Sequence, residues 1–181
     1  DQGFAFGHGN GTNHHYGYNV RKIYDAMWLM RDKIAARGKT DEYVKVLAYW
    51  SGLAETRKPY VYGRDELLDS WHTLLIPKLI SALMLPSEAE QYRAMKGLGV
   101  WLSGSLGFTP GTIGGIKPDG TTFHHGGFSP AYSTGAFAMI GYWCKATRGT
   151  DFILSEQARR NFKLALMSMA NYTDLRDWGL G

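Results

Sequence analysis

Apolar residues recur at helical spacing along most of the chain. From Val20 to Ala36 they return every three or four positions with charged residues between them, which predicts an amphipathic helix that Gly38 ends. The same period continues from Thr40, the expected N-cap, to Leu53 and stops before Pro59. These two segments predict a helical hairpin.

Residues 65–85 predict a third helix, with Pro77 expected to kink it. Ser87 and Glu90 have the spacing of a capping box, which begins a fourth helix that runs through Trp101.

Two more helices are predicted at residues 134–147 and 155–172, the last one capped by Ser155. Since no segment alternates with period two for long enough to build a sheet, the predicted class is all-α. Successive helical hairpins favour a toroid or solenoid-like array, and no linker divides the chain, so residues 1–181 are predicted to form one domain.

Two long segments lack the helical pattern: residues 1–19 and residues 108–133. Both are rich in glycine, histidine and aromatic residues. Loops of ~20 residues or more inside a compact domain usually carry function. These segments are therefore the first places to look for a site.

Composition narrows the classes of function. The chain has 181 residues, 44% of them hydrophobic. Its net charge is +4 without a basic run, a pattern that disfavours binding to nucleic acid but suits binding to an acidic polymer. Its single cysteine, Cys144, excludes an internal disulfide and a cysteine-rich zinc site. No apolar run reaches the ~20 residues that would cross a bilayer, so no membrane association is expected.

Four of the six histidines form two adjacent pairs on these segments. His14 and His15 precede Tyr16, and His124 and His125 lie shortly before Tyr132. If both segments lie at one end of the helical array, they form a single cleft suited to proton transfer. A neutral histidine or an ionised tyrosine could then remove the proton alpha to a uronate carboxylate, and a protonated tyrosine could protonate the departing glycosidic oxygen, which is β-elimination.

Other interpretations of these residues stand beside this one. The paired histidines could bond to backbone groups, and Tyr132 could be a buried ring. Four histidines could bind a metal, but adjacent histidines rarely face one ion and no HExxH motif is present, so no metal site is predicted. Trp101, ahead of the second segment, is the candidate for stacking on sugars.

Three motifs in order resemble a known family: DQGFAF at residues 1–6, HHYGY at residues 14–18, and GIKPDGTTFHHGGFSPAY at residues 115–132. Together they resemble the catalytic helical domain of polysaccharide lyase family 8, most closely the chondroitin sulfate ABC lyases. The resemblance implies an incomplete (α/α) toroid and elimination across chondroitin or dermatan sulfate.

The resemblance also implies roles for particular residues. His125 and Tyr132 match the catalytic histidine and tyrosine. One histidine of the pair His14 and His15, assigned here to His15, matches a histidine that serves the opposite uronate epimer. Asn13, His14, Tyr16, Tyr18 and His124 are implied to bind substrate. Where the family has an arginine directly before the catalytic histidine, this chain has His124, which implies a weaker clamp on the substrate carboxylate.

The family also uses an arginine after the sixth helix and a glutamate from a β-sandwich domain. Neither falls within this chain, which is therefore expected to be a segment of a larger multidomain lyase that lacks the C-terminal sandwich and is inactive by itself. A monomer, secreted or periplasmic, is expected. No cofactor is expected to be required, although calcium or magnesium could assist.

Two alternatives belong to other classes. One is a carbohydrate-binding helical domain without catalysis, which would retain the polymer but form no unsaturated uronide. The other is a different toroid lyase that acts on hyaluronan, alginate or heparin. The polymers that are cleaved distinguish this second alternative from a lyase that acts on chondroitin or dermatan sulfate.

Overall fold

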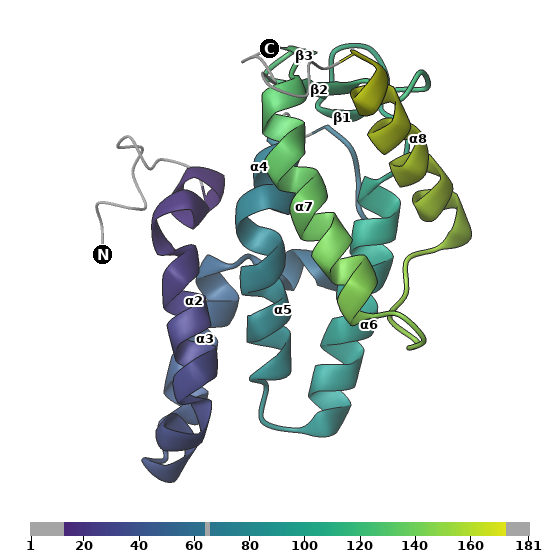
Figure 1. Ribbon diagram of the computed structural model, residues 1–181. Coiled ribbons are helices and arrows are strands. Elements are labelled where there is room, and N and C mark those ends of the chain that lie inside the picture. The colour runs from purple at the N-terminus through teal and green to yellow at the C-terminus, as the bar shows by residue number, and fades with distance from the viewer. Residues whose placement is uncertain (1–12, 64–65, 173–181) are drawn as a thin grey trace. The chain divides into compact units, whose positions relative to one another are not determined.

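The computed structural model describes residues 13–63 and 66–172, which fall into two compact units (Figure 1). The first unit comprises Asp1–Lys58 and Thr73–Leu98, and the second comprises Pro59–His72 and Gly99–Gly181. Each unit is described by itself. Whether the chain forms one domain, as predicted, stays a prediction.

The first unit is built around a helical hairpin. Helices α2 (Asn13–Ala36) and α3 (Thr40–Trp50) pack against each other and against α5 (Leu75–Leu83). A 3₁₀ turn (Leu53–Arg57) follows α3, and α6 (Glu88–Ser105) begins in this unit. Its core consists of these apolar side chains: Val20, Tyr24, Ile34, Val44, Leu47, Ile80 and Met84.

The ends of the hairpin differ in part from the prediction. Gly38 has a φ of +66° and ends α2 as expected, because glycine adopts this left-handed conformation without strain. The expectation that Thr40 caps α3 was wrong. Thr40 is already helical, and the N-cap is Lys39, whose side chain makes no capping bond and instead lies 2.6 Å from Glu42.

Helix α2 begins at Asn13, so the expectation of a loop over residues 13–19 was also wrong. Gly17 explains why this segment lies close to its neighbours. A Cβ atom on Gly17 would lie 2.6 Å from the Cβ atom of Thr73, so only glycine fits between α2 and the residues just before α5. Residues 1–12, which carry the first motif, lie outside the described residues.

The predicted third helix is interrupted rather than continuous. A short helix α4 (Leu67–Asp69) leads into a π-helical turn (Ser70–Leu74) before α5 begins. Pro77 lies in the first turn of α5. Its ring cannot donate a backbone hydrogen bond and would crowd the carbonyl group four residues earlier, at Thr73, which lies within the π turn. The predicted distortion is thus present, one turn before the proline.

The second unit places a small sheet beside two long helices. Strands β1 (Gly115–Ile116), β2 (Thr122–His124) and β3 (Gly127–Phe128) form an antiparallel sheet in the order β1-β2-β3. The sheet lies near the start of α7 (Pro130–Ala146) and the end of α8 (Glu156–Tyr172) (Figure 1). The all-α prediction is confirmed in that helices dominate. The strands were missed because two or three residues are too few to show an alternating pattern.

Two of the predicted helix starts are confirmed, and a third was wrong. The Ser87 hydroxyl lies 3.3 Å from the Glu90 backbone nitrogen, and the Ser155 hydroxyl lies 3.2 Å from that of Ala158, as expected for N-caps. Helix α7 begins at Pro130 and not at residue 134, because proline suits the first helical position, where no backbone donor is needed.

Tryptophan, asparagine and phenylalanine side chains hold the second unit together. Trp71 donates from Nε1 to the Ser105 hydroxyl over 2.9 Å, and the Asn161 amide donates to the Leu106 carbonyl over 2.8 Å. Phe137 of α7 meets Phe162 of α8 edge to face, with centroids 5.3 Å apart.

Among the described helices, none is both long and apolar enough to cross a membrane.

Replacing Gly17 by alanine should destabilise the protein by about 1–3 kcal/mol, because the added methyl group enters space that Thr73 occupies. Gly141→Ala in α7 is the matched control, since nothing lies within 4 Å of its added Cβ. That variant should gain about 0.5–1 kcal/mol from the lower entropy of its unfolded state. Urea denaturation of both variants measures the difference, and equal stability would contradict the close contact.

Candidate active site

The second unit gathers a carboxylate, two imidazoles and a phenol in one place. Asp69 comes from α4, His124 ends strand β2, His125 lies in the turn between β2 and β3, and Tyr132 lies in the first turn of α7. The predicted pair His125 and Tyr132 is thus brought together. Their ring centroids lie 6.1 Å apart, with the planes at 82°.

The segment before β2 is fixed by a buried lysine. Lys117 is 6% exposed, and its ammonium group donates to the Thr109 hydroxyl over 3.0 Å and to the Ile113 carbonyl over 2.5 Å. Further donations reach the carbonyl groups of Thr109 and Pro110. Burial lowers the pKa of Lys117 below its ordinary value, and nearby Asp119 opposes that change only in part. These bonds hold residues 109–117 as one folded loop.

The DG turn between β1 and β2 is held from two sides. The Asp119 carboxylate accepts hydrogen bonds from the backbone nitrogen and the hydroxyl of Thr121, and these bonds lower the pKa of Asp119. The Ser168 hydroxyl of α8 donates to the Asp119 carbonyl over 2.8 Å. Gly120 has a φ of +83° and packs against Ser168, which leaves no room for a side chain. The turn therefore fixes the start of β2.

Strand β2 is also tied to α7, which carries Tyr132. The Thr122 hydroxyl forms a hydrogen bond with the hydroxyl of Ser133, and the backbone nitrogen of Ser129 donates to the Thr122 carbonyl over 3.0 Å. Because Tyr132 and Ser133 are neighbours, this link fixes the phenol relative to the β2–β3 hairpin.

His125 occupies an unusual backbone conformation. His124 pairs with Gly127 across the hairpin, so the connecting loop consists of only His125 and Gly126, with φ values of +52° and +76°. Two positive φ values are typical of a type I′ turn, which asparagine and glycine favour and which few other residues adopt. Such a strained position points to a functional constraint on the side chain. The turn leaves His125 exposed.

A buried acid–base pair lies beneath these exposed groups. His124 Nε2 is 3.4 Å from Asp69 Oδ2, and both side chains are fully buried. The His124 ring stacks at a tilt against both catalytic candidates, with centroids 3.9 Å from His125 and 4.4 Å from Tyr132. Because a buried carboxylate is costly unless it is matched, Asp69 and His124 stabilise each other inside the unit.

The arrangement suits acid–base chemistry at a surface. Tyr132 is 38% exposed and His125 is also exposed, so both reach solvent from rigid elements. One group can accept a proton while the other donates one.

Two predicted substrate-binding residues are buried inside the second unit. His124 is 2% exposed and faces Asp69. Trp101 is 5% exposed and packs edge to face on Tyr60, with centroids 5.6 Å apart. Sequence did not show this burial, because it gives position along the chain only. That His124 and Trp101 bind substrate stays a prediction.

The other predicted residues lie on α2 in the first unit. Asn13, His14, His15 and Tyr16 are helical, and their side chains lie outside the described residues. Tyr18 is exposed. That this motif joins the second one in a single cleft stays a prediction.

Sequence reasoning missed Asp69. A usable signal existed, because Asp69 directly follows Leu67 and Leu68 on the predicted helix, and an acidic residue at a buried helical position needs a partner. The partner could not be named, since His124 lies far along the chain.

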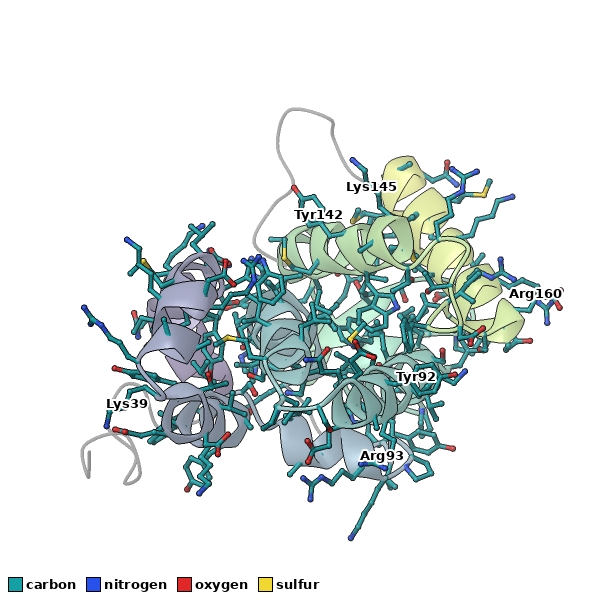
Figure 2. The ribbon with its side chains drawn as sticks, turned by 90° about the horizontal axis from the view of Figure 1, so that it is seen from below. Lys39, Tyr92, Arg93, Tyr142, Lys145 and Arg160 are labelled. Atoms are coloured by element: carbon teal, nitrogen blue, oxygen red, sulfur yellow. The ribbon has the colours of Figure 1, made fainter. Side chains whose placement is uncertain are left out.

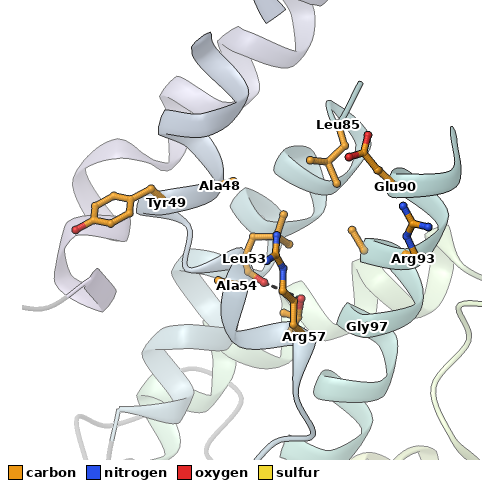
Figure 3. Close-up of a pocket in the computed structure, with 11 residues that line it drawn as sticks. Ala48, Tyr49, Leu53, Ala54, Arg57, Leu85, Glu90, Arg93 and Gly97 are labelled. Atoms are coloured by element: carbon orange, nitrogen blue, oxygen red, sulfur yellow. Dashed lines mark hydrogen bonds between the residues drawn. The ribbon is translucent and has the colours of Figure 1, made fainter. Parts of the chain in front are cut away.

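The first unit carries a pocket of about 540 Å³ (Figure 3). Leu53 and Leu85 contribute apolar surface, while Arg57, Arg93 and Glu90 carry charges on its walls. Neither His125 nor Tyr132 lines this pocket.

The site residues also offer donors for a metal. Asp69, His124 and His125 each present a ligand atom, and these atoms all lie within 4.8 Å of one another. Adjacent histidines rarely face one ion, but here the backbone of His125 has a positive φ and its ring lies 3.9 Å from that of His124, centroid to centroid. Calcium and magnesium prefer oxygen donors, so two imidazoles do not fit them.

Comparison with known proteins adds a family. A sequence model described as "Lyase, catalytic" matches residues 1–181. The chain is 33% identical over 172 residues to a chondroitin sulfate ABC exolyase of Bacteroides thetaiotaomicron, covering 95% of this chain and 17% of the relative. It is 30% identical over 176 residues to a chondroitin sulfate ABC endolyase of Proteus vulgaris, covering 96% of this chain and 17% of that relative. The chain thus spans about a sixth of the length of these relatives.

Lys117→Met should lower the free energy of unfolding by about 1.5–3 kcal/mol at neutral pH, because carbonyl groups around the ammonium group lose their donor. The folded state releases the Lys117 proton at a lower pH than the unfolded state does, since burial lowers this pKa. The wild type should therefore gain stability over the variant as pH rises toward about 10.4. Urea denaturation at several pH values measures both effects, and a difference that shrinks with pH would contradict this account.

Proposed function

Because the chain belongs to the family of lyase catalytic domains, we propose that it supplies catalytic groups to a lyase that cleaves chondroitin and dermatan sulfate by β-elimination. The observation that carries this proposal is the exposed pair His125 and Tyr132, held 6.1 Å apart by a short hairpin and a helix start.

The reaction needs one group that accepts a proton and one that donates a proton, and this pair supplies both. The His125 imidazole accepts the proton from the carbon next to the uronate carboxylate. The electrons of that C–H bond form the new carbon–carbon double bond as the bond to the glycosidic oxygen breaks. Tyr132 donates its phenolic proton to the departing oxygen, so that an unsaturated uronide and a free hydroxyl result.

The buried pair beneath supports this pair without touching substrate. The ring of His124 contacts both His125 and Tyr132, and Asp69 holds His124 in place. Truncating either buried group would loosen both exposed ones. His15 on α2 assists in the opposite uronate epimer, and Asn13, His14, Tyr16 and Tyr18 contribute to substrate binding.

We place the chain within an (α/α) toroid of a larger, monomeric lyase. The coverage of 17% of each relative supports this view, because they are several times longer than the chain. A long acidic polymer is cleaved outside the cell, which favours a secreted or periplasmic enzyme. The net charge of +4 favours capture of such a polymer.

Tyr132→Phe should reduce elimination at least 100-fold in the full-length protein, because the variant lacks only the hydroxyl that protonates the leaving oxygen. Tyr142→Phe is the matched control. It lies on the same helix, is 59% exposed and projects outward (Figure 2). Ultraviolet absorbance of the unsaturated uronide, followed on chondroitin sulfate, dermatan sulfate, hyaluronan and alginate, reports the rate.

A Tyr132→Phe rate within a few fold of the wild type would end the assigned role of Tyr132. No absorbance change on any of the four polymers, with the polymers still retained on a column of immobilised protein, would favour a binding domain instead.

His125→Asn tests the base separately from the fold. Asparagine tolerates a positive φ as well as any residue except glycine, so the type I′ turn should remain and the melting temperature should stay within a few degrees. Loss of the imidazole should still lower the rate at least 100-fold. An active variant with an intact fold would show that another group takes the proton.

A further inference from the structure

Three donor groups from three elements converge at the base of the site. Asp69 is on α4, His124 is the last residue of β2, and His125 is in the hairpin turn. Their donor atoms all lie within 4.8 Å of one another. We propose that this cluster is a binding site for a zinc ion.

The site is built into the fold rather than formed by mobile surface groups. The side chains of Asp69 and His124 are fully buried, so their positions are set by packing. In a strand, adjacent side chains point to opposite faces, which would separate His124 from His125. The left-handed conformation of His125 reverses this and brings the two rings to a centroid distance of 3.9 Å.

The separation of the two buried donors fits a metal better than a direct hydrogen bond. His124 Nε2 lies 3.4 Å from Asp69 Oδ2, beyond the usual hydrogen-bond distance of about 2.7–3.2 Å. Around a tetrahedral zinc ion, with bonds of about 2.0–2.2 Å, neighbouring donor atoms lie about 3.4 Å apart. The donor atom of His125, on the exposed turn, lies within 4.8 Å of both.

The chemistry of the donors selects the ion. Two imidazoles and one carboxylate suit zinc and neighbouring transition metals, whereas calcium and magnesium prefer oxygen ligands. Three protein ligands leave a fourth position of a tetrahedral ion open. Since His125 is exposed, that position faces solvent.

The effect of zinc on catalysis rests on the proposed function of His125 as the group that accepts the proton. A nitrogen lone pair that binds zinc is not available to accept a proton from substrate. Zinc occupancy should therefore inhibit elimination reversibly, and a chelator should restore it. The cluster would then act as a metal-sensitive switch on the lyase.

Binding is tested first without reference to catalysis. The untagged full-length protein, freed of metal with a chelator, is titrated with cobalt(II), whose visible absorption reports coordination by nitrogen and oxygen ligands. Zinc should displace the cobalt and abolish the bands. Absence of cobalt bands and of measurable zinc binding by calorimetry would overturn the proposal.

Two variants assign the ion to this cluster. Asp69→Asn and His125→Asn should each weaken zinc binding at least tenfold. If Asp69→Asn fails to fold, His125→Asn still tests whether zinc binds at this cluster. Asp32→Asn removes an exposed carboxylate on α2 and is the matched control, expected to bind as the wild type does. Unchanged affinity in His125→Asn would place the ion elsewhere, for example at His14 and His15, and would also overturn the proposal.

The lyase assay then separates the two proposals. Inhibition of the wild type by zinc, with a midpoint that matches the calorimetric affinity, supports the switch. If zinc binds at the cluster but leaves elimination unchanged, the switch is wrong. If the protein eliminates none of the polymers yet loses its cobalt bands in Asp69→Asn and His125→Asn, the proposed function fails and the metal site stands.

Discussion

The second unit depends on the burial of one carboxylate. Asp69 lies in an apolar part of the chain and is fully buried, so a complementary group must face it. His124 supplies that group from a strand of only three residues. Because a slip of one residue would turn His124 to the other face, the pair fixes the register of β2 and, with it, the position of the hairpin turn.

The exposed chemistry follows from that register. His124 is buried in the second unit, and the two-residue loop places His125 next to it. The backbone of His125 has the positive φ that this tight turn requires. The bond between Thr122 and Ser133 then brings the first turn of α7 against the hairpin, and Tyr132 comes with it. A buried pair thus positions two exposed groups that are seven residues apart in sequence.

The anchors of the hairpin are mostly polar. Lys117 satisfies several carbonyl groups of an irregular loop, and Asp119 and Ser168 hold the turn that follows. Long irregular segments bury few apolar side chains, so hydrogen bonds have to replace helical or strand pairing. This explains why polar residues such as Lys117 and Asp119 hold the segment that carries the site.

The sequence by itself determined the helical class, most helix boundaries and the catalytic candidates His125 and Tyr132, because 3.6-residue periodicity, capping residues and local motifs are all written within a few neighbouring positions. For the same reason, the sequence correctly predicted that Gly38 ends a helix and that Ser87 and Ser155 cap the starts of two others. Only the tertiary structure decided that Asp69 belongs to the site, that His124 and Trp101 are buried, and that His124 and His125 face the same side. These facts depend on contacts between residues far apart in the chain and on one positive φ, neither of which leaves a periodic trace in the sequence.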